Sequence, residues 1–430
     1  MTKKSLSELA NIQNVCDDYD PNSMSVEHAR EYIKAFLTPV KETEQISLLK
    51  ALGRILAHEI YAPHNVPNHD NSAMDGYAFA GSSISKSELT TLTVIGKGLA
   101  GNAFEGTVGI GQCVRIMTGA VMPDGCDTMI PQEMVKAEGD QISFKSSKIK
   151  AGDNRRLKGE DLTAGQPALP AGKIIRPSDL GLIASLGIGT VEVKRRLRVG
   201  FFSTGDELRS IGENLDDGCV YDSNRYTLFG MLSRLGVELH DFGVVRDEPD
   251  AMRAAFSQAA SRCDAVITSG GVSVGEADYT KQIMRELGDV SFWKIAMRPG
   301  RPMAFGSIKG DNHQAVLFGL PGNPVAVMVT FYQFVRNALL SMSGATDVAP
   351  LVMQAKAVEA IRKRPGRTEF QRGVLSTDAT GTRTVRITGA QGSGVLRSMS
   401  EADCFIVLEH DQDQINAGDT VGVILFEGLV

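Results

Sequence analysis

Cysteine pairs of the kind that bind zinc are missing from this sequence. Its six cysteines are scattered over 430 residues without a C-x-x-C motif: Cys16, Cys113, Cys126, Cys219, Cys263 and Cys404. Such spacing indicates neither a zinc knuckle nor a disulfide framework. We therefore expect reduced and mostly buried thiols.

A large charge excess and a long apolar run are missing too. The net charge of −6 gives no general attraction to nucleic acid or to an acidic membrane, so any anion site must be local. The first segment, MTKKSLSELANIQNVCDDYD, lacks the apolar run of a signal peptide. No later stretch approaches the roughly 18 apolar residues of a membrane span, and we expect a cytoplasmic protein.

The sequence does have enough length for several domains. At about 100–200 residues per domain, its 430 residues suggest more than one. A helix is predicted over residues 26–37 behind Ser25 as N-cap, and a short helix over 177–187, which begins with proline. From about residue 61, short apolar runs broken by Gly, Pro and Asn are typical of β structure. This β-rich segment is predicted as an insertion between two pieces of a helical domain.

Strands and helices alternate from about residue 197 to 344. Buried-looking strands, each followed by a helical pattern, are predicted near 198–202, 237–245, 265–269 and 315–320. The alternation predicts a largely parallel sheet covered by helices on both faces, with ligands bound at the carboxyl ends of the strands. The tail of the chain returns to β texture, which fits a small barrel or sandwich.

The segment ITSGGVSVGEADYT, residues 267–280, follows the third of these strands. Its backbone could approach a phosphate at Ser269, Gly270, Gly271 and Gly275. Glu276 and Asp278 would repel that phosphate unless a cation lay between them, and Mg²⁺ takes one or two carboxylates plus phosphate oxygens. An ordinary glycine-rich turn is the alternative, because a single such loop is weak evidence.

Two other predicted strand ends carry acids. Asp206 and Glu207 follow the first strand, and Asp247 follows the second. Each acid alone would be explained as a helix cap or first-turn acid. Together with Asp278 they place three acidic strand ends on one rim, which favours a metal site.

Two further segments lie close to this rim in the predicted sheet. FWKIAMRPGRPMAFG carries Lys294, Arg298 and Arg301, which suit a multiply charged oxyanion, although each alone could be a solvated surface cation. FGLPGNP stiffens a turn that could hold a second phosphate or a ring, or could be a plain rigid connection. Its turn residues are Pro321, Gly322 and Pro324.

Several segments, taken in chain order, resemble one known family. They are VPNHDNSAMDGYA, RIMTGA, KGEDL, FSTGDEL, YDSNR, TSGGVSVGEADYT, RPGRPMAFG, GLPGNP, FQRGVL and GAQGSGVL. The sequence resembles the molybdopterin molybdenumtransferase family, which includes the bacterial molybdenum-insertion enzymes and the corresponding domain of gephyrin. The likeness runs from about residue 26 to the C-terminus.

The resemblance implies an enzyme that inserts molybdate into the dithiolene of adenylylated molybdopterin, with release of AMP assisted by Mg²⁺. It also implies a homodimer of elongated four-domain subunits, in which the partner's β-rich domain completes the active-site cleft. Expected partners are a molybdopterin adenylyltransferase and downstream cofactor-transfer proteins. Nucleic acid and membranes are not expected to bind.

The expected fold is therefore multidomain, α/β plus β. A doubly wound, mostly parallel α/β molybdopterin-binding domain is expected over 197–346, and a β-rich inserted second domain over 61–165. The remaining expected parts are a flexible extension over 1–22, a small helical domain over 23–60 and 166–196, and a C-terminal β-barrel domain over 347–430.

The resemblance also assigns roles to residues at matching positions. Residues important for activity, expected across the dimer cleft, are Asp75, Thr118 and Asp161. In the α/β domain Glu207, Asp247 and Asp278 match acids that handle metal and substrate, and Lys294 matches a basic active-site position. Further matches are Arg372 and Ser393, which would line the cleft, and the turn prolines Pro321 and Pro324.

The sequence departs from the family pattern at one motif. Bacterial relatives commonly carry KPGKP where RPGRP stands here, so Arg298 and Arg301 replace lysines and a planar fork replaces a point charge. Two other functions remain as alternatives. Adenylylation of molybdopterin from ATP is disfavoured because the related enzymes are smaller and lack the DNSAMDGYA and FQRGVL domains. A pterin carrier or scaffold without turnover is disfavoured because the matched acids are present.

Overall fold

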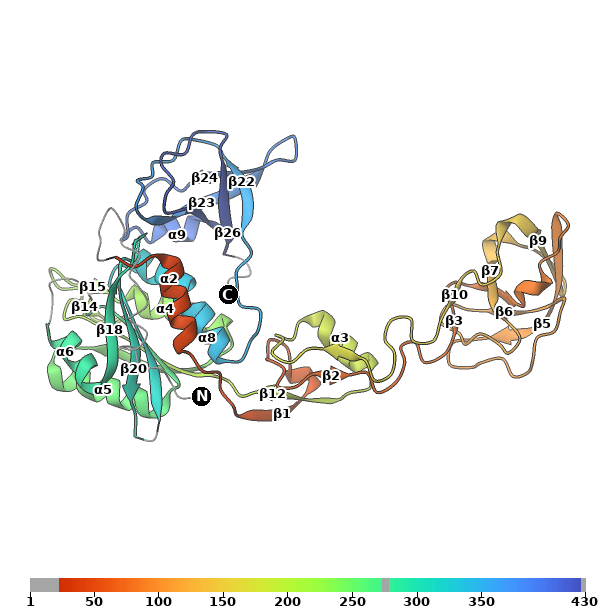
Figure 1. Ribbon diagram of the computed structural model, residues 1–430, viewed down its shortest axis with the longest axis horizontal. Helices are drawn as coiled ribbons and strands as arrows, with labels where there is room; N and C mark the ends of the chain where they lie inside the picture. Colours follow the sequence, from red (N-terminus) through yellow and green to blue (C-terminus); the bar gives the residue numbers. More distant parts are fainter. Residues whose placement is uncertain (1–22, 273–277, 312, 427–430) are drawn as a thin grey trace.

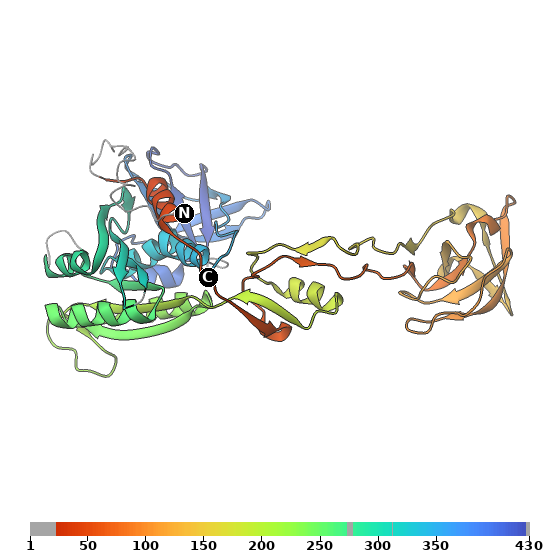
Figure 2. The same cartoon turned by 60° about the horizontal axis from the view of Figure 1, so that its bottom comes forward.

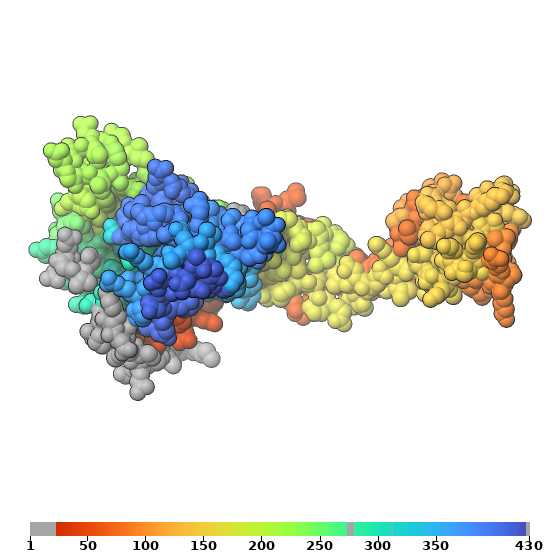
Figure 3. All heavy atoms as spheres, turned by 90° about the horizontal axis from the view of Figure 1, so that it is seen from above, coloured from red at the N-terminus to blue at the C-terminus, as the bar shows by residue number. Residues whose placement is uncertain are grey.

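The protein is elongated in the computed structural model, which describes residues 23–272, 278–311 and 313–426 (Figure 1). An α/β domain and a β-barrel lie together at one end, and a separate β domain lies at the other. Figures 2 and 3 show a narrow waist of extended chain between the two ends. The α/β domain with its barrel and the distal β domain are therefore far apart within one subunit.

The waist is built from two stretches that are distant in the sequence. Strand β1 (Thr43–Ser47) pairs antiparallel with β12 (Thr190–Lys194), and β2 (Ile60–Tyr61) pairs with β11 (Pro167–Leu169). One helix, α3 (Pro177–Ser185), packs here through the buried Ile183. The region is thus mixed in structure and differs from the helical domain expected from the sequence.

The first described helix accounts for this difference. Helix α2 (Val26–Phe36) is capped as predicted, since the Ser25 side chain accepts a hydrogen bond from the His28 backbone N–H at 3.1 Å. Its apolar side chains Val26, Ala29 and Ile33 are buried in the core of the α/β domain. The apolar face of α2 therefore belongs to that core and leaves the waist with a single α-helix among its described residues.

The distal domain is the expected β-rich insertion. Its six strands pair in the order β7-β4-β6-β5-β9-β8. Their bounds are β4 (Gly76–Phe79), β5 (Leu89–Gly98), β6 (Gln112–Ile116), β7 (Thr128–Pro131), β8 (Lys136–Glu138) and β9 (Gln141–Lys145). Phe79 and Phe144 pack with ring centroids 5.6 Å apart in a separate small core. The pair β3 (Asn71–Ser72) and β10 (Arg155–Arg156) joins this domain to the waist.

The α/β domain is built on one sheet with strand order β16-β13-β17-β21-β20-β18. Its parallel strands are β13 (Arg198–Thr204), β16 (Glu238–Val245), β17 (Ala265–Ser269) and β21 (Gln314–Leu320). Antiparallel strands β20 (Pro302–Lys309) and β18 (Gly288–Lys294) complete one edge. The predicted mostly parallel sheet is confirmed, and its parallel strands end on the same rim.

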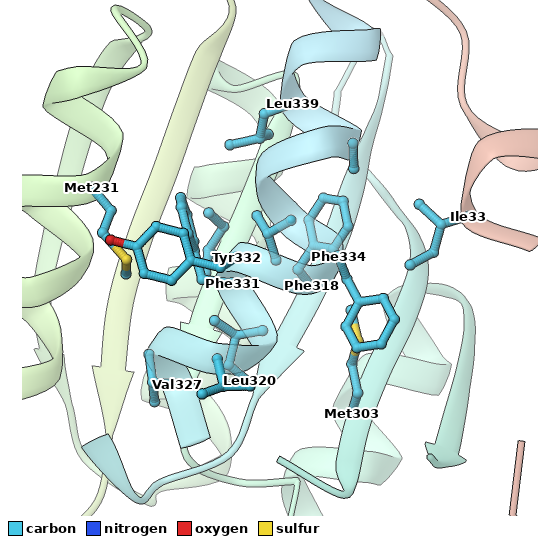
Figure 4. Packing of buried hydrophobic residues seen from close by; sticks show 14 of the residues in the cluster. Ile33, Met231, Met303, Phe318, Leu320, Val327, Phe331, Tyr332, Phe334 and Leu339 are labelled. Carbon is cyan, nitrogen blue, oxygen red and sulfur yellow. The ribbon is translucent and has the colours of Figure 1, made fainter. Parts of the chain in front are cut away.

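Helices cover both faces of this sheet, as predicted. One face carries α2, α4 (Ser223–Arg234), α7 (Pro324–Thr330), the π-helix η5 (Phe331–Val335) and α8 (Arg336–Met342). The other face carries α5 (Pro249–Arg262) and α6 (Asp278–Leu287). Figure 4 shows Tyr332 directed toward Met231 of α4, while Phe334 lies toward Met303 and Ile33. This packing fixes the turn after β21 against the sheet.

Helices α7, η5 and α8 form one continuous apolar helix. By length and composition, Pro324–Met342 could cross a membrane, although 78% of its most apolar window is buried inside the protein. The expectation that no stretch approaches a membrane span is therefore wrong for this segment. Burial against the sheet explains its apolar composition, because both sides of the helix meet other core residues.

A closed barrel forms the C-terminal part. Strands pair in the order β23-β24-β22-β26-β25, and β25 returns to β23. Their bounds are β22 (Met353–Ala357), β23 (Thr368–Thr377), β24 (Arg383–Ile387), β25 (Cys404–Leu408) and β26 (Thr420–Leu425), with helix α9 (Arg397–Glu401) beside them. Strand β19 (Met297–Arg298) of the preceding domain pairs with β23. The predicted barrel is confirmed, and it is joined directly to the α/β domain.

The five cysteines within the described ranges are all free thiols. Cys113, Cys263 and Cys404 are buried, and burial raises the pKa of each of these thiols to about 12. Thiols of this kind are protonated at neutral pH and poorly nucleophilic.

Candidate functional site

A cavity of about 710 Å³ lies where the α/β domain meets the barrel. Its floor includes Thr204, Ser269 and Pro321, at or just beyond the carboxyl ends of β13, β17 and β21. Its walls include the loop over 298–302 and the barrel segment 391–393. Because ligands of such sheets bind beyond the carboxyl ends of the strands, this cavity is the candidate site.

The glycine loop after β17 leaves the floor free of side chains. Gly270 and Gly271 have φ values of 94° and 68°, which side-chain-bearing residues rarely adopt. A Cβ atom on Gly270 would lie 2.5 Å from the Thr204 carbonyl oxygen. The Gly270 N–H donates to the Leu320 carbonyl at 3.1 Å, which ties this loop to the next strand. Glycine is thus needed at position 270 because a side chain would collide with the end of β13, and the loop itself lines the cavity.

Hydrogen bonds below the loop hold the strand ends in place. The Ser203 and Ser269 hydroxyls lie 3.0 Å apart, and Ser203 donates to Asp222 Oδ1 at 3.0 Å. Asn224 Nδ2 donates to the Gly322 carbonyl at 2.7 Å. Within the described residues, Thr204 Oγ1 and Asn224 Oδ1 are buried without a hydrogen-bond partner, and both residues line the cavity. These atoms are suited to a polar ligand, since an unsatisfied buried polar group is costly.

Two of the predicted acids, Glu207 and Asp247, line the cavity, and we call the part that they line the acidic wall. The backbone N–H of Asp247 donates to Asp206 Oδ1 at 3.2 Å, which joins the loops after β13 and β16. Asp278 begins α6, and its side chain lies outside the described part of the structure, as do Gly275 and Glu276. No group of three or more metal-binding side chains occurs among the described residues.

The cations after β18 divide into two groups. Arg298 and Arg301 line the cavity, and Arg301 Nη2 donates to the buried Ser23 hydroxyl at 3.3 Å. Lys294 ends β18 with an exposed side chain and is not part of the cavity wall. Its backbone carbonyl accepts the Met24 N–H at 2.8 Å. The structure therefore brings the two arginines to the site but not Lys294.

Arg372 lies behind the wall rather than on it. This side chain is 1% exposed, and its guanidinium donates to Ser398 Oγ and to the Gly392 carbonyl, each at 3.0 Å. Arg372 thereby holds the loop that presents Gln391, Gly392 and Ser393 to the cavity. Burial, and to a smaller extent the charge of Arg298, lower the pKa of Arg372 to about 10. The guanidinium stays charged at neutral pH.

The turn after β21 meets the same barrel loop. Pro321 and Gly322 line the cavity, whereas Pro324 is the first residue of α7. The Val325 N–H at this helix start donates to the Ser393 carbonyl at 3.1 Å. This donor is thus used to join the two domains, and it is not available to the second phosphate considered from the sequence.

The other predicted residues lie in the distal domain. Asp75 precedes β4, and its Oδ1 accepts from the Thr118 N–H at 2.8 Å and from the Thr118 hydroxyl at 2.7 Å. These bonds lower the pKa of the Asp75 carboxyl, the hydroxyl bond having the larger effect. Asp161 is exposed, and its N–H donates to the Val66 carbonyl at 3.0 Å. None of the three residues lines the cavity of its own chain.

Some lining residues were missed by the sequence reasoning. They are Thr204, Asn224, Asn323, Arg367 and Gln391. All except Arg367 stand inside or beside motifs that were singled out, such as FSTGDEL, YDSNR and GAQGSG. The signal that marks these residues in the sequence is the motif in which each of them lies.

Comparisons with known proteins agree over most of the chain. Three family profiles match: the MoeA N-terminal region (domain I and II) at residues 24–187, a probable molybdopterin binding domain at 200–341, and the MoeA C-terminal region (domain IV) at 354–426. The molybdopterin molybdenumtransferase of Haemophilus influenzae is 41% identical over 408 residues, covering 95% of this chain and 100% of that protein. The enzyme of the same name from Nostoc is 34% identical over 389 residues, covering 89% of each.

A solved structure shares the architecture. The crystal structure of the molybdopterin biosynthesis moeA protein from Pyrococcus horikoshii matches with a TM-score of 0.80 at 28% identity, covering 94% of this chain and 100% of that one. Sequence relatives, family profiles and fold thus lead to one assignment. The protein belongs to the molybdopterin molybdenumtransferase family, the transferases of molybdenum cofactor biosynthesis.

Proposed function

We propose that the enzyme inserts molybdate into the dithiolene of adenylylated molybdopterin and releases AMP by hydrolysis of the pyrophosphate link. The observation that carries this proposal is the composition of the cavity. Two carboxylates, Glu207 and Asp247, line it together with the cations Arg298 and Arg301. A site that takes a pyrophosphate with a cation, and also takes a separate oxyanion, needs both kinds of group.

Molybdate is assigned to the cationic part of the cavity. Arg298 has no ion-pair partner within the described residues, and it lies close enough to the buried Arg372 to lower the pKa of that guanidinium. Two positive groups that repel each other are stabilised when a dianion binds near them. Arg298, Arg301 and Ser393 would contact the ion, while Arg372 acts as a positioning residue through the barrel loop.

The pterin is assigned to the floor formed by the strand ends. The backbone of Gly270 and Gly271 lines the cavity and would face a phosphate. The Thr204 hydroxyl and the Asn224 side-chain oxygen, which have no hydrogen-bond partner within the described residues, would offer polar contacts. In this arrangement the dithiolene end would lie toward the arginines and the pyrophosphate toward the acidic wall. The residues themselves bind and orient the substrate.

Mg²⁺ fits the donors on the acidic wall. Glu207 and Asp247 supply two carboxylates in one cavity, and Mg²⁺ usually takes one or two carboxylates along with substrate phosphates. These two residues, with Asp278, would hold the ion. When bound, Mg²⁺ would neutralise charge on the pyrophosphate.

We also propose a homodimer in which the distal domain completes the partner's cavity. Asp75 and Thr118 are hydrogen-bonded to each other, but they belong to the distal domain, which lies at the opposite end of the molecule from the cavity. A twofold dimer would bring the distal pair of each subunit to the cavity of the other. A cytoplasmic location, and contacts with a molybdopterin adenylyltransferase and cofactor-transfer proteins, belong to the same proposal.

The test is AMP release by the purified protein given adenylylated molybdopterin, molybdate and Mg²⁺. Release should require both molybdate and the metal, and it should stop when either is omitted. Asp278→Asn should abolish release while leaving pterin binding largely intact, whereas a fully active variant would remove Asp278 from the metal site. Tight pterin binding without release would support a carrier, and ATP-dependent adenylylation of free molybdopterin would support the preceding reaction.

A further inference from the structure

A second groove opens on the barrel beside the candidate cavity. Its volume is about 520 Å³, and both Arg298 and Arg367 line this groove as well as the cavity. It lies where β19 pairs with β23, with Arg298 opposite Glu369. Because two lining residues are shared, the groove and the cavity are adjacent, and Arg298 lies at both.

The groove carries a local excess of positive charge. Five of its lining side chains are cationic and two are anionic: Arg298, Arg362, Lys363, Arg364 and Arg367 against Glu369 and Asp413. The whole chain, by contrast, has a net charge of −6. A concave surface of one sign raises the local concentration of oppositely charged ligands, so this groove would attract anions that the rest of the protein repels.

Two of these cations are already used inside the protein. Lys363 is 5% exposed, and its ammonium donates to the carbonyls of Arg364 at 2.9 Å, His410 at 3.1 Å and Gln412 at 2.9 Å. Arg367 Nη2 pairs with the buried Glu369 at 2.8 Å. These contacts fix the segment that carries the neighbouring arginines.

The remaining cations of the groove have no carboxylate partner within the described residues. Arg298, Arg362 and Arg364 are exposed, and within the described part of the chain no carboxylate pairs with any of them. The buried Lys363 stands between Arg362 and Arg364 and anchors their backbone. Guanidinium groups bind tetrahedral oxyanions through paired N–H donors, so two unpartnered arginines on an anchored backbone favour this ligand class.

We propose that this groove is an accessory site for a doubly charged tetrahedral oxyanion, captured by Arg362 and Arg364 and passed to the cavity along Arg298. The proposal rests on the proposed function, in which molybdate, an ion of this class, is the substrate. A phosphate group of the nucleotide has the same chemistry, so the experiment must separate the free ion from the nucleotide.

The test compares Arg362→Ala/Arg364→Ala with the control Arg383→Ala/Arg386→Ala. The control removes two exposed cations of β24 in the same barrel, and neither of them lines the groove or the cavity. We expect KM for molybdate in AMP release to rise about tenfold in the groove variant with kcat unchanged, since charge focusing acts on capture. The difference should shrink as salt is raised, and the control should match the wild type.

Calorimetric titration of molybdate and of AMP, each alone, identifies the source of the anion. Weaker molybdate binding by the groove variant, with AMP binding unchanged, is the expected result. Weaker AMP binding with an unchanged molybdate KM would still support an oxyanion site but assign it to the nucleotide. If neither ligand binds more weakly and KM is unchanged, the groove proposal is overturned. A wild type that releases no AMP would refute the proposed function, while the two titrations would still decide on the groove.

Discussion

The two regions that carry the predicted site residues are organised in opposite ways. The cavity combines residues of the α/β domain and the barrel. Within the described residues, two buried oxygens of its lining side chains, Thr204 Oγ1 and Asn224 Oδ1, have no hydrogen-bond partner. The distal pair of Asp75 and Thr118 is satisfied by its own two hydrogen bonds. The cavity is therefore built to receive a ligand, whereas the distal pair is complete before any ligand arrives.

The two regions also have separate cores. The distal core around Phe79 shares no residue with the core around Phe318 in the α/β domain. Short paired strands in the waist connect the two ends. Each half of the proposed site thus has its own hydrophobic core, and the proposed twofold dimer would bring the halves together.

The largest expected effect comes from variants that inactivate one half of the proposed site, either the distal pair or the cavity. Asp75→Asn and Glu207→Gln should each lower AMP release at least about 100-fold, as for the loss of one electrostatic group at a reacting centre. Heterodimers that carry one copy of each variant should recover about half of wild-type activity, because one of their two sites is intact. The measurement is AMP release by dimers purified through two different tags.

The control for this experiment is a mixture of two variants from the same half. Glu207→Gln with Asp247→Asn should not recover activity, since each subunit of the mixed dimer then has one change in its own cavity and neither cavity is intact. Failure of Asp75→Asn and Glu207→Gln to complement would place both halves within one chain and contradict the dimer proposal.

The fold was largely predictable because its strongest signals are local. Strand–helix alternation predicted the α/β sheet, and Ser25 marked the start of α2. The position of α2 was not predictable in this way. Its amphipathic pattern shows that one face is buried, but the pattern is the same whichever core buries it.

The site was predictable in composition and less so in geometry. The glycine loop, Glu207 and Asp247 meet at one cavity because parallel strand ends share a rim. Arg372 matched a cleft residue, yet its side chain turns inward to hold a loop. Lys294 shows the same limit. Its charge suggested a place in the site, but its position at the end of β18 determines where its side chain lies.

The separate cores should unfold separately. Phe79→Ala and Phe318→Ala should each cost about 3–5 kcal/mol, because each removes a fully buried ring. Phe79→Ala should lower the unfolding temperature of the distal domain alone, and Phe318→Ala that of the α/β domain alone. Calorimetry of both variants measures this. A single transition lowered equally by either change would mean that the two regions form one cooperative unit.

A smaller effect is expected from the support behind the cavity. Arg372→Ala removes a charged group that donates to Ser398 and Gly392, and such bonds contribute about 1.5–3 kcal/mol each. KM for molybdate should therefore rise about 10- to 100-fold, with a smaller change in kcat. Arg372→Lys keeps the positive charge but not the planar guanidinium with its several N–H donors, so its KM for molybdate should lie between those of the wild type and Arg372→Ala.

The matched control for this position is Arg397→Ala in the same barrel. Arg397 is exposed and pairs with Glu401 on the surface of α9, so its loss should leave KM unchanged. Equal KM values for Arg372→Ala and wild type, with normal thermal unfolding, would show that the barrel loop needs no support from Arg372.

The smallest expected effect concerns the distal pair alone. The Thr118 hydroxyl and N–H both stabilise the ionised Asp75 carboxylate and lower its pKa. Thr118→Val removes the hydroxyl, so the pKa of Asp75 should rise and the acid limb of activity should move to higher pH. Thr118→Ser keeps the hydroxyl and should leave both unchanged. Carboxyl NMR titration measures the shift, with Asp127, which accepts from Gly81 and Thr128 in the same domain, as internal reference. An unchanged Asp75 titration in Thr118→Val would mean that the backbone N–H alone sets the charge of this carboxylate.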